Sequence, residues 1–167
     1  CLYPLGNGFP VPPIEQGARR VLLVGGGVGT APMLYYGRTL RAAGHTPVFL
    51  LGGRSERDLL QRERFSEIGQ LCYTTEDGSA GEQGFVTQHS VWNTQHFDLV
   101  AACGPVPMMK AVAALSRQKG YACRVSLENM MACGIGACLC CVEKTTKGNV
   151  CVCTEGPVFD IDELTWQ

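Results

Sequence analysis

The chain has 167 residues, of which 46% are hydrophobic and 17% are charged, and its formal net charge is −1. This length allows one packed domain with a small additional module, and the near-neutral charge excludes the basic surface typical of nucleic-acid-binding proteins. There is no apolar run near the roughly 20 residues that span a membrane, nor a secretion signal, so we expect a cytoplasmic protein without membrane contact.

An alternation of strands and helices is predicted from residue 20 onward. Short apolar runs bounded by glycines indicate buried parallel strands, and apolar residues three or four positions apart indicate helices. We predict strands at 21–24, 46–53, 71–78, 97–105 and 122–128, and helices at 30–44, 55–65, 84–92 and 107–120. Thr30 is expected to cap the first helix and Ser55 to open the second. The alternation predicts an α/β fold, a parallel sheet flanked by helices on both faces.

The composition changes near Glu128, where the alternation ends and a cysteine-rich stretch begins. We therefore predict a connector at 1–17, a nucleotide-binding α/β domain at 18–128 and a small module at 129–167. Because the chain opens on Cys1 in a turn-rich stretch without an initiator Met, we expect it to be the remainder of a longer protein.

A glycine-rich turn, VGGGVGTAP at 24–32, joins the first predicted strand to the first predicted helix. Glycines allow the backbone to turn sharply and approach a ligand, and a helix N-terminus offers free N–H groups to a pyrophosphate. Such turns also occur without a ligand, but the strand–helix context favours a dinucleotide site. The candidate residues here are Gly25, Gly26, Gly27, Gly29 and Thr30.

The usual dinucleotide fingerprint also has an acidic residue at the end of the second strand, and this chain lacks it. That strand ends in Gly52-Gly53-Arg54. Arg54 is a candidate contact for a ribose or a phosphate, with a solvated loop arginine as the alternative. Cys103, Gly104 and Pro105 follow another buried strand and are expected to border the same crevice, although Cys103 could equally be a buried core residue.

Six of the ten cysteines lie between 133 and 153. Cys133, Cys138 and Cys141 have the C-x4-C-x2-C spacing of plant-type [2Fe–2S] ligands, for which a distant fourth cysteine completes the set. Zinc prefers paired C-x2-C knuckles, and disulfides would require an oxidising compartment, so both are weaker alternatives.

Spacing alone leaves the fourth ligand open between Cys151 and Cys153. Cys140 fits less well than Cys141, because choosing it would change the intervals to six and one residues. The glycines and alanines between the cysteines allow the backbone to wrap closely around a cluster.

Five segments in this order resemble the electron-transfer subunits of bacterial NAD-linked, heteromeric dihydroorotate dehydrogenases, which belong to the ferredoxin-reductase-like superfamily. The segments are PLGNGF (4–9), VGGGVGTAP (24–32), ACGPVPMMKAV (102–112), MACGIGACLCCV (131–142) and VCTEGPVF (152–159). In that family the fourth cluster ligand directly precedes the x-acidic-Gly-Pro sequence, so the resemblance selects Cys153.

The resemblance implies an FAD-binding β-barrel, a nicotinamide-binding α/β domain and a small C-terminal [2Fe–2S] domain. The barrel would precede Cys1, residues 1–17 would be its remnant, and this chain would hold FAD weakly or not at all. The implied function is electron transfer in pyrimidine biosynthesis, from dihydroorotate through the cluster and FAD to NAD+, with a flavin-containing catalytic subunit as partner and no catalytic side chain here.

NAD rather than NADP is favoured by the family and not by the residues, since Arg54 could accept a 2′-phosphate. Two alternatives stay open: the flavin subunit of a related NAD(P)-linked ferredoxin or sulfide reductase, and a non-catalytic metal-binding docking module.

Overall fold

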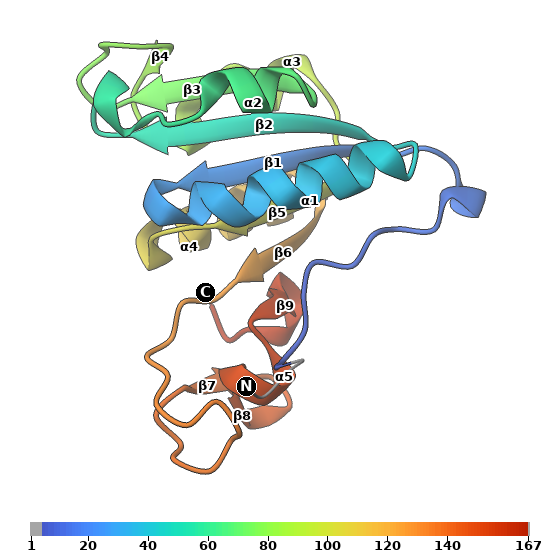
Figure 1. Ribbon diagram of the computed structural model, residues 1–167, viewed down its shortest axis with the longest axis vertical. Helices are drawn as coiled ribbons and strands as arrows, with labels where there is room; N and C mark the ends of the chain where they lie inside the picture. Colours follow the sequence, from blue (N-terminus) through green and yellow to red (C-terminus); the bar gives the residue numbers. More distant parts are fainter. Residues whose placement is uncertain (1–4, 167) are drawn as a thin grey trace.

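A seven-stranded sheet forms the centre of the computed structural model, which describes residues 5–166 (Figure 1). Residues 1–4 of the predicted connector, which include Pro4 of the PLGNGF segment, therefore lie outside the described residues. The strand order is β4 (Glu82–Gln83), β3 (Gln70–Thr75), β2 (Thr46–Gly53), β1 (Arg20–Gly26), β5 (Leu99–Cys103), β6 (Ala122–Ser126) and β9 (Val158–Asp160). Within this range, no helix is both long and apolar enough to cross a bilayer.

Six of these strands pair in parallel, and only β9 pairs antiparallel, with β6. The α/β prediction is confirmed. Residues of β1 alternate between the two faces: Val21 and Leu23 pack with the helix α1 (Thr30–Ala42), whereas Leu22 and Val24 pack with α4 (Val106–Lys119). Figure 1 shows α1 in front of the sheet and α4 behind it. The core therefore consists of two apolar layers separated by the sheet.

The start of α1 differs from the prediction. The glycine loop forms a short 3₁₀ turn, η2 (Gly27–Gly29), and the N-cap position is Gly29 instead of Thr30. Thr30 is the first helical residue, and its hydroxyl donates a hydrogen bond to the Gly27 carbonyl at 3.0 Å. This hydrogen bond closes the turn, and no side chain caps the helix.

The single helix predicted at 55–65 is wrong. The chain instead forms η3 (Glu56–Asp58) and a separate α2 (Arg62–Ser66), with Gln61 between them in the left-handed region at φ 58°. The carboxylate of Asp58 accepts hydrogen bonds from the backbone N–H groups of Arg54 and Ser55, which closes a tight turn in place of a continuous helix.

The helix predicted at 84–92 is likewise divided, into η4 (Val86–Gln88) and α3 (Val91–Thr94). His89 lies between them in extended conformation, and its Nδ1 accepts the N–H of Val91 at 2.9 Å. Local side-chain hydrogen bonds compete with the helix in both segments, and apolar periodicity alone does not reveal them.

The cysteine segment forms a small lobe below the sheet, coloured orange to red in Figure 1. It contains the hairpin of β7 (Val142–Thr145) and β8 (Gly148–Cys151) and the short helix α5 (Val152–Glu155). The chain then returns to the sheet as β9 and ends beyond η5 (Ile161–Glu163). The lobe is therefore attached to the sheet at two paired strands, β6, which leads into it, and β9, which follows it.

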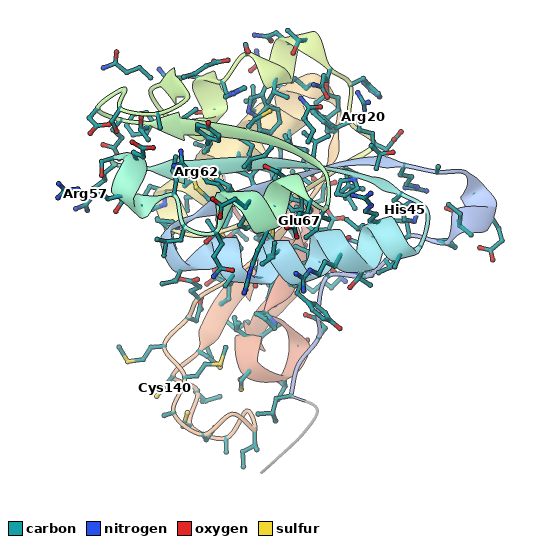
Figure 2. The ribbon with its side chains drawn as sticks, turned by 45° about the horizontal axis from the view of Figure 1, so that its top comes forward. Arg20, His45, Arg57, Arg62, Glu67 and Cys140 are labelled. Carbon is teal, nitrogen blue, oxygen red and sulfur yellow. The ribbon has the colours of Figure 1, made fainter. Side chains whose placement is uncertain are left out.

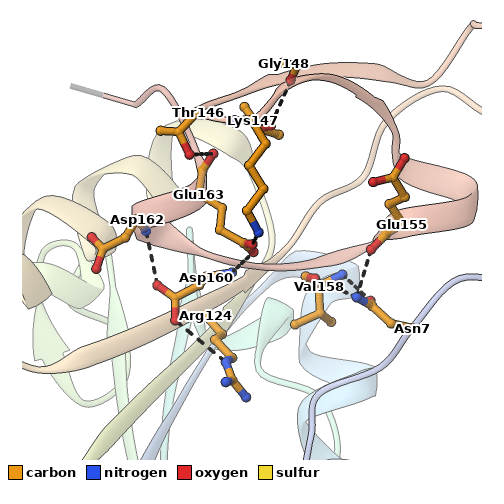
Figure 3. A network of polar contacts seen from close by, with 11 residues as sticks. Asn7, Arg124, Thr146, Lys147, Gly148, Glu155, Val158, Asp160, Asp162 and Glu163 are labelled. Atoms are coloured by element: carbon orange, nitrogen blue, oxygen red, sulfur yellow. Dashed lines mark hydrogen bonds and ion pairs between the residues drawn. The ribbon is translucent and has the colours of Figure 1, made fainter.

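Asn7 fastens the N-terminal segment to this lobe (Figure 3). Its side-chain amide donates to the carbonyls of Glu155 and Val158 and accepts from the Val158 N–H, each at 2.9 Å. Its own N–H donates to the Gly156 carbonyl at 2.6 Å. Gly6 has φ +62°, and a Cβ there would lie 2.1 Å from the Gly156 oxygen, so this close approach requires glycine. We refer to these contacts as the Asn7 clamp.

Candidate functional site

An open cleft of about 1180 Å³ lies at the carboxyl ends of β1, β2 and β3. Ligands in parallel α/β sheets bind at this edge, outside the strand ends. The glycine loop, the first turn of α1, the end of β2, the turn into α4 and the loop after β4 all contribute residues to the wall. The position of the cleft therefore follows from the strand order.

The predicted nucleotide residues take two different positions in this region. Gly26, Gly27, Thr30, Arg54 and Pro105 line the cleft. Gly25, Gly29, Cys103 and Gly104 lie behind its wall instead, where the two loops pack together. A Cβ on Gly29 would lie 2.3 Å from the Cys103 carbonyl oxygen, and one on Gly104 would lie 2.8 Å from the Gly26 oxygen. Glycine thus allows the two loops to meet backbone to backbone.

Gly27 has a different requirement from Gly29. It adopts φ +56°, which disfavours other residues, yet a Cβ there would meet no atom within 4 Å. A side chain at this position would therefore cost backbone strain and would project from the glycine loop toward a ligand rather than into the protein.

The cleft also contains residues that the sequence reasoning did not select. Glu76 follows β3, and Phe85 precedes η4 with 60% of its surface exposed. The dinucleotide fingerprint expects an acidic residue after the second strand, whereas Glu76 follows the third, so the missed signal was its position.

Cys103 is a core residue beside the cleft and does not line it. It is 3% exposed, and burial, assisted by the Glu128 carboxylate, raises the pKa of its thiol to about 11. The sulfur lies 3.9 Å from Glu128 Oε1, so the neutral thiol donates a weak hydrogen bond to that carboxylate. This geometry agrees with the core alternative for its side chain.

The four cysteines that we predict as ligands form two pairs joined by backbone hydrogen bonds. The Cys138 N–H donates to Cys133 Sγ at 3.3 Å, and the Cys153 N–H donates to Cys141 Sγ at 3.4 Å. The Gly136 N–H links the loop to the second pair by donating to Cys153 Sγ at 3.2 Å. Positive φ angles at Gly134 and Gly136 turn the loop backbone so that these donors face sulfur.

These donors stabilise thiolates, the form of cysteine that binds metals. Backbone hydrogen bonding from Cys140, followed by hydrogen bonding to Cys133, lowers the pKa of Cys138 to about 6. The Cys153 N–H lowers the pKa of Cys141. The pKa of Cys153 is raised, chiefly because its thiol hydrogen-bonds to Cys141.

The two remaining cysteines of the segment have different surroundings. Cys140 is exposed on the cysteine loop, far from the sheet (Figure 2). Cys151 donates its thiol proton to the Gly136 carbonyl at 3.7 Å, a contact that a metal-bound thiolate could not make. All nine cysteines among residues 5–166 are free, so the structure gives no support to the disulfide alternative in this range.

The donor set fits an iron–sulfur cluster. Two thiol pairs with inward N–H donors suit a group that contains two metal ions, since each pair can serve one of them.

Comparison with protein families agrees with both halves of this description. Residues 23–114 match the model of the oxidoreductase NAD-binding domain, and this match covers more than half of the chain. The chain belongs to the oxidoreductase NAD-binding family. Residues 128–165 match the iron–sulfur cluster binding domain of dihydroorotate dehydrogenase B. The predicted NAD-binding and iron–sulfur-binding functions are thereby confirmed.

The chain is also similar in sequence to individual electron-transfer subunits. The chain is 44% identical over 163 residues to the dihydroorotate dehydrogenase B (NAD(+)) electron transfer subunit of Lysinibacillus sphaericus, covering 95% of this chain and 62% of that protein. It is 41% identical to the subunit of Caldanaerobacter subterraneus, covering 96% and 64%. The chain thus spans somewhat less than two thirds of these curated relatives, and the resemblance stated from its motifs is confirmed.

Solved structures extend the comparison to the fold. A structure described as an NADH-dependent reduced ferredoxin–NADP oxidoreductase, studied for flavin-based electron bifurcation, has a TM-score of 0.87 and 32% identity, covering 99% of this chain and 59% of that one. The C-terminal domain of a Pyrococcus furiosus hydrogenase has a TM-score of 0.58 and 17% identity, covering 74% and 99%, and so shares the fold alone.

Proposed function

We propose that this chain is the nicotinamide-binding and cluster-binding part of a dihydroorotate dehydrogenase B electron-transfer subunit. In the complete protein, electrons from dihydroorotate would reach NAD+ through a [2Fe–2S] cluster and FAD. The observation that supports this most is the combination, on one 167-residue chain, of a glycine-loop cleft with paired cysteines whose sulfurs accept backbone N–H groups. The substrate is taken from the relatives, which are dihydroorotate dehydrogenase B subunits.

We assign Cys133, Cys138, Cys141 and Cys153 as the cluster ligands. When bound, an iron–sulfur cluster accepts and releases single electrons. The chain's own contribution is to hold the four sulfurs in two pairs and to direct the N–H groups of Cys138, Gly136 and Cys153 toward them. Such donors stabilise negative charge on sulfur and so raise the reduction potential.

We assign the cleft to the dinucleotide. The glycine loop offers backbone N–H groups at the start of α1, where the helix dipole favours a pyrophosphate. Gly26 and Gly27 line this part of the wall without side chains, which allows a ligand to approach the backbone closely. Gly25, Gly29, Cys103 and Gly104 support the wall from behind.

A catalytic partner subunit would meet the cysteine lobe, because electrons must pass close to the cluster. Exposed apolar side chains gather on this lobe: Met130 is 82% exposed, Leu139 is 63% exposed and Ile135 is 55% exposed. Apolar side chains concentrated in one exposed region are typical of protein–protein contacts. We therefore expect the partner to cover the cysteine loop.

FAD is expected to bind weakly or not at all to this chain, as the family resemblance implies. In the family resemblance, the PLGNGF segment (4–9) would line only one side of a flavin. NADH should consequently bind without reducing the cluster, since a flavin is needed to convert hydride into single electrons.

The experiment is anaerobic reconstitution of the chain with iron and sulfide, followed by visible spectroscopy and addition of NADH. Broad absorption from about 400 to 600 nm, with two irons per chain, is expected for the proposed cluster. A colourless protein that binds zinc would contradict the assignment and favour a docking module. Flavin at one equivalent per chain would contradict the expectation for FAD.

The 32% identical ferredoxin–NADP oxidoreductase structure supports one alternative, a flavin subunit of a ferredoxin reductase. Within a longer protein that contains this chain and a catalytic subunit, dihydroorotate-driven reduction of NAD+ supports the first proposal. Electron exchange with reduced ferredoxin, but not with dihydroorotate, would support the alternative.

A further inference from the structure

Cys151 is a cysteine of the lobe that has no part in the function described so far. It is the last residue of β8 and pairs with Val142 of β7. Its neighbour Val152 donates its N–H to the carbonyl of the ligand Cys141 at 3.1 Å, so Cys151 lies close to the ligands. Its side chain is partly buried against the apolar core that contains Cys141 and Cys153. A thiol in this place belongs either to the ligands or to the groups that support them.

The Cys151 thiol is directed toward the cysteine loop. Its Sγ donates to the Gly136 carbonyl at 3.7 Å, the long contact of a weak S–H donor. The N–H of the same Gly136 donates to Cys153 Sγ at 3.2 Å. Two cysteines that lie two residues apart therefore hold the carbonyl and the N–H of a single glycine.

Gly136 is held in place by contacts from other residues. Its backbone is in the left-handed region at φ +77°, and it has no side chain that could anchor it. A Cβ there would lie 3.3 Å from Thr154 Cγ2 and 3.9 Å from Cys151 Cβ, so these two residues form the surface against which the glycine packs. The Thr154 hydroxyl donates to the Cys151 carbonyl at 3.1 Å, which fixes the two supporting residues relative to each other.

The Gly136 N–H has a particular place among the donors to sulfur, because it joins the cysteine loop to the Cys141–Cys153 pair. A hydrogen bond weakens steeply when its donor turns away from the acceptor. Hydrogen bonds to the sulfurs are among the factors that set the potential of an iron–sulfur cluster. A residue that fixes the orientation of Gly136 can therefore act on the potential without binding metal.

We propose that Cys151 is a positioning residue of the cluster site: its thiol holds the Gly136 backbone so that the Gly136 N–H points to Cys153 Sγ, and this raises the reduction potential. The inference rests on the proposed cluster function of the lobe. Cys151 acts here through Gly136 and is not itself a ligand. The weak S–H donor acts together with the packing of Cys151 and Thr154, and only the donor is lost when sulfur is replaced by carbon.

The test uses the 167-residue chain, labelled with ¹⁵N-glycine and reconstituted with iron and sulfide. Over residues 5–166, Gly136 is the only glycine whose N–H donates to a cysteine sulfur. Pulsed EPR of the dithionite-reduced protein detects nitrogen nuclei that are hydrogen-bonded to the cluster, so a glycine coupling reports this one bond. A redox titration followed by EPR gives the reduction potential. We expect the wild-type protein to show the glycine coupling.

Three variants of Cys151 separate the donor from the space that it fills. Cys151→Ala removes the thiol, so the glycine coupling should be lost and the potential should fall. Cys151→Val should give the same two changes although its side chain fills a similar volume, which excludes a cavity as the cause. Cys151→Ser keeps a donor on a shorter arm, and it should recover part of the coupling and part of the potential.

Cys140→Ala is the matched control. It removes an exposed thiol of the same loop, whereas the side chains packed against Gly136 come from Thr154 and Cys151. The glycine coupling should therefore be unchanged. Loss of the coupling in Cys140→Ala as well as in Cys151→Ala would show a general loosening of the loop and overturn the specific role of Cys151.

The other outcomes distinguish this inference from the function on which it rests. A folded wild-type chain that forms no cluster would overturn both. A cluster whose glycine coupling and potential are the same in wild type, Cys151→Ala and Cys151→Val would overturn only the role of Cys151. Loss of the cluster in all three Cys151 variants, with Cys140→Ala still loaded, would make Cys151 a ligand and also overturn the inference. Iron content and circular dichroism show whether each variant is loaded and folded.

Discussion

The cleft and the cysteine lobe are built by opposite means. The wall of the cleft is formed mainly by loops at the ends of strands whose side chains are fully buried, as for Leu22, Val24 and Leu50. The lobe consists of a hairpin of two four-residue strands, a four-residue helix and a loop with exposed apolar side chains. A site on a packed sheet is formed before its ligand binds, whereas a short loop of cysteines depends on clamps and on metal for its order.

Loss of a cluster ligand should give the largest effect, because it should remove the cluster from the lobe and leave the cleft unchanged. Cys141→Ser is expected to abolish the visible absorption of the reconstituted chain, because it removes one member of the buried Cys141–Cys153 pair. NADH binding should persist, since the cleft is formed by the sheet. Absorbance and iron content per chain are the measurements.

Cys140→Ser and Cys151→Ser are the matched controls and should both keep the cluster. Cys140 is exposed, and the Cys151 thiol is directed to a carbonyl. A colourless Cys140→Ser or Cys151→Ser protein would require a different ligand set.

The Asn7 clamp should give the next largest effect. Asn7→Ala removes three side-chain hydrogen bonds to the strand and turn that follow the cysteines. Partly exposed bonds of this kind contribute on the order of 0.5–1 kcal/mol each, so we expect a loss of about 2 kcal/mol concentrated in the lobe. Hydrogen exchange should accelerate across 129–157 and much less in β1 and β2.

Asn149→Ala, on β8, provides the comparison for Asn7→Ala. Asn149 is paired with Lys144 through the backbone of the hairpin, so hydrogen exchange in the lobe should hardly change in this variant. Uniformly faster exchange in the whole sheet after Asn7→Ala would show that the lobe and the sheet form one cooperative unit, and the contrast between the two regions would fail.

A substitution in the glycine loop should change the affinity for NADH rather than the order of the lobe. Gly27→Val should weaken NADH binding while the fold persists, because φ +56° strains the new residue by about 1–2 kcal/mol but no protein atom lies within 4 Å of its Cβ. Titration with NADH and thermal unfolding separate the two quantities.

Gly29→Ala is the matched variant, and we expect it to affect the stability of the fold more than the direct contact with NADH. A Cβ 2.3 Å from the Cys103 oxygen would force the two loops apart. The free energy of unfolding should therefore fall further than in Gly27→Val. Unchanged NADH affinity in a folded Gly27→Val protein would reduce the loop to a structural turn.

The parts that sequence reasoning predicted well are those whose signal is local. Strand β2 was predicted with its observed bounds, Thr46–Gly53, because an unbroken apolar run between a turn and two glycines has few other interpretations. The cysteine spacing likewise specifies its own chemistry.

The failures were residues whose role depends on a specific hydrogen bond or on a neighbouring strand rather than on apolar periodicity. Asp58 breaks the predicted helix through its bonds to Arg54 and Ser55, and Glu76 reaches the cleft only because β3 pairs with β2. The Asn7 clamp joins residues almost 150 positions apart in sequence, as the separation of 148 between Asn7 and Glu155 shows. Periodicity within a window does not reveal such contacts.

The smallest expected effect is a pH dependence confined to the α/β part. Burial lowers the pKa of His89, and the Glu82 carboxylate, 3.5 Å from Nε2, opposes this only in part. Because Nδ1 accepts the Val91 N–H, protonation there would break that bond. A histidine whose folded pKa lies below its unfolded value of about 6.5 stabilises the fold above that pH, and the contribution is lost as the pH falls below it. We expect the free energy of unfolding to drop by less than about 1 kcal/mol on this account, and His89→Gln should flatten the dependence between pH 6.5 and 5. An unfolding free energy that rises on acidification through this range in wild type, but not in His89→Gln, would reverse the sign assigned to this histidine.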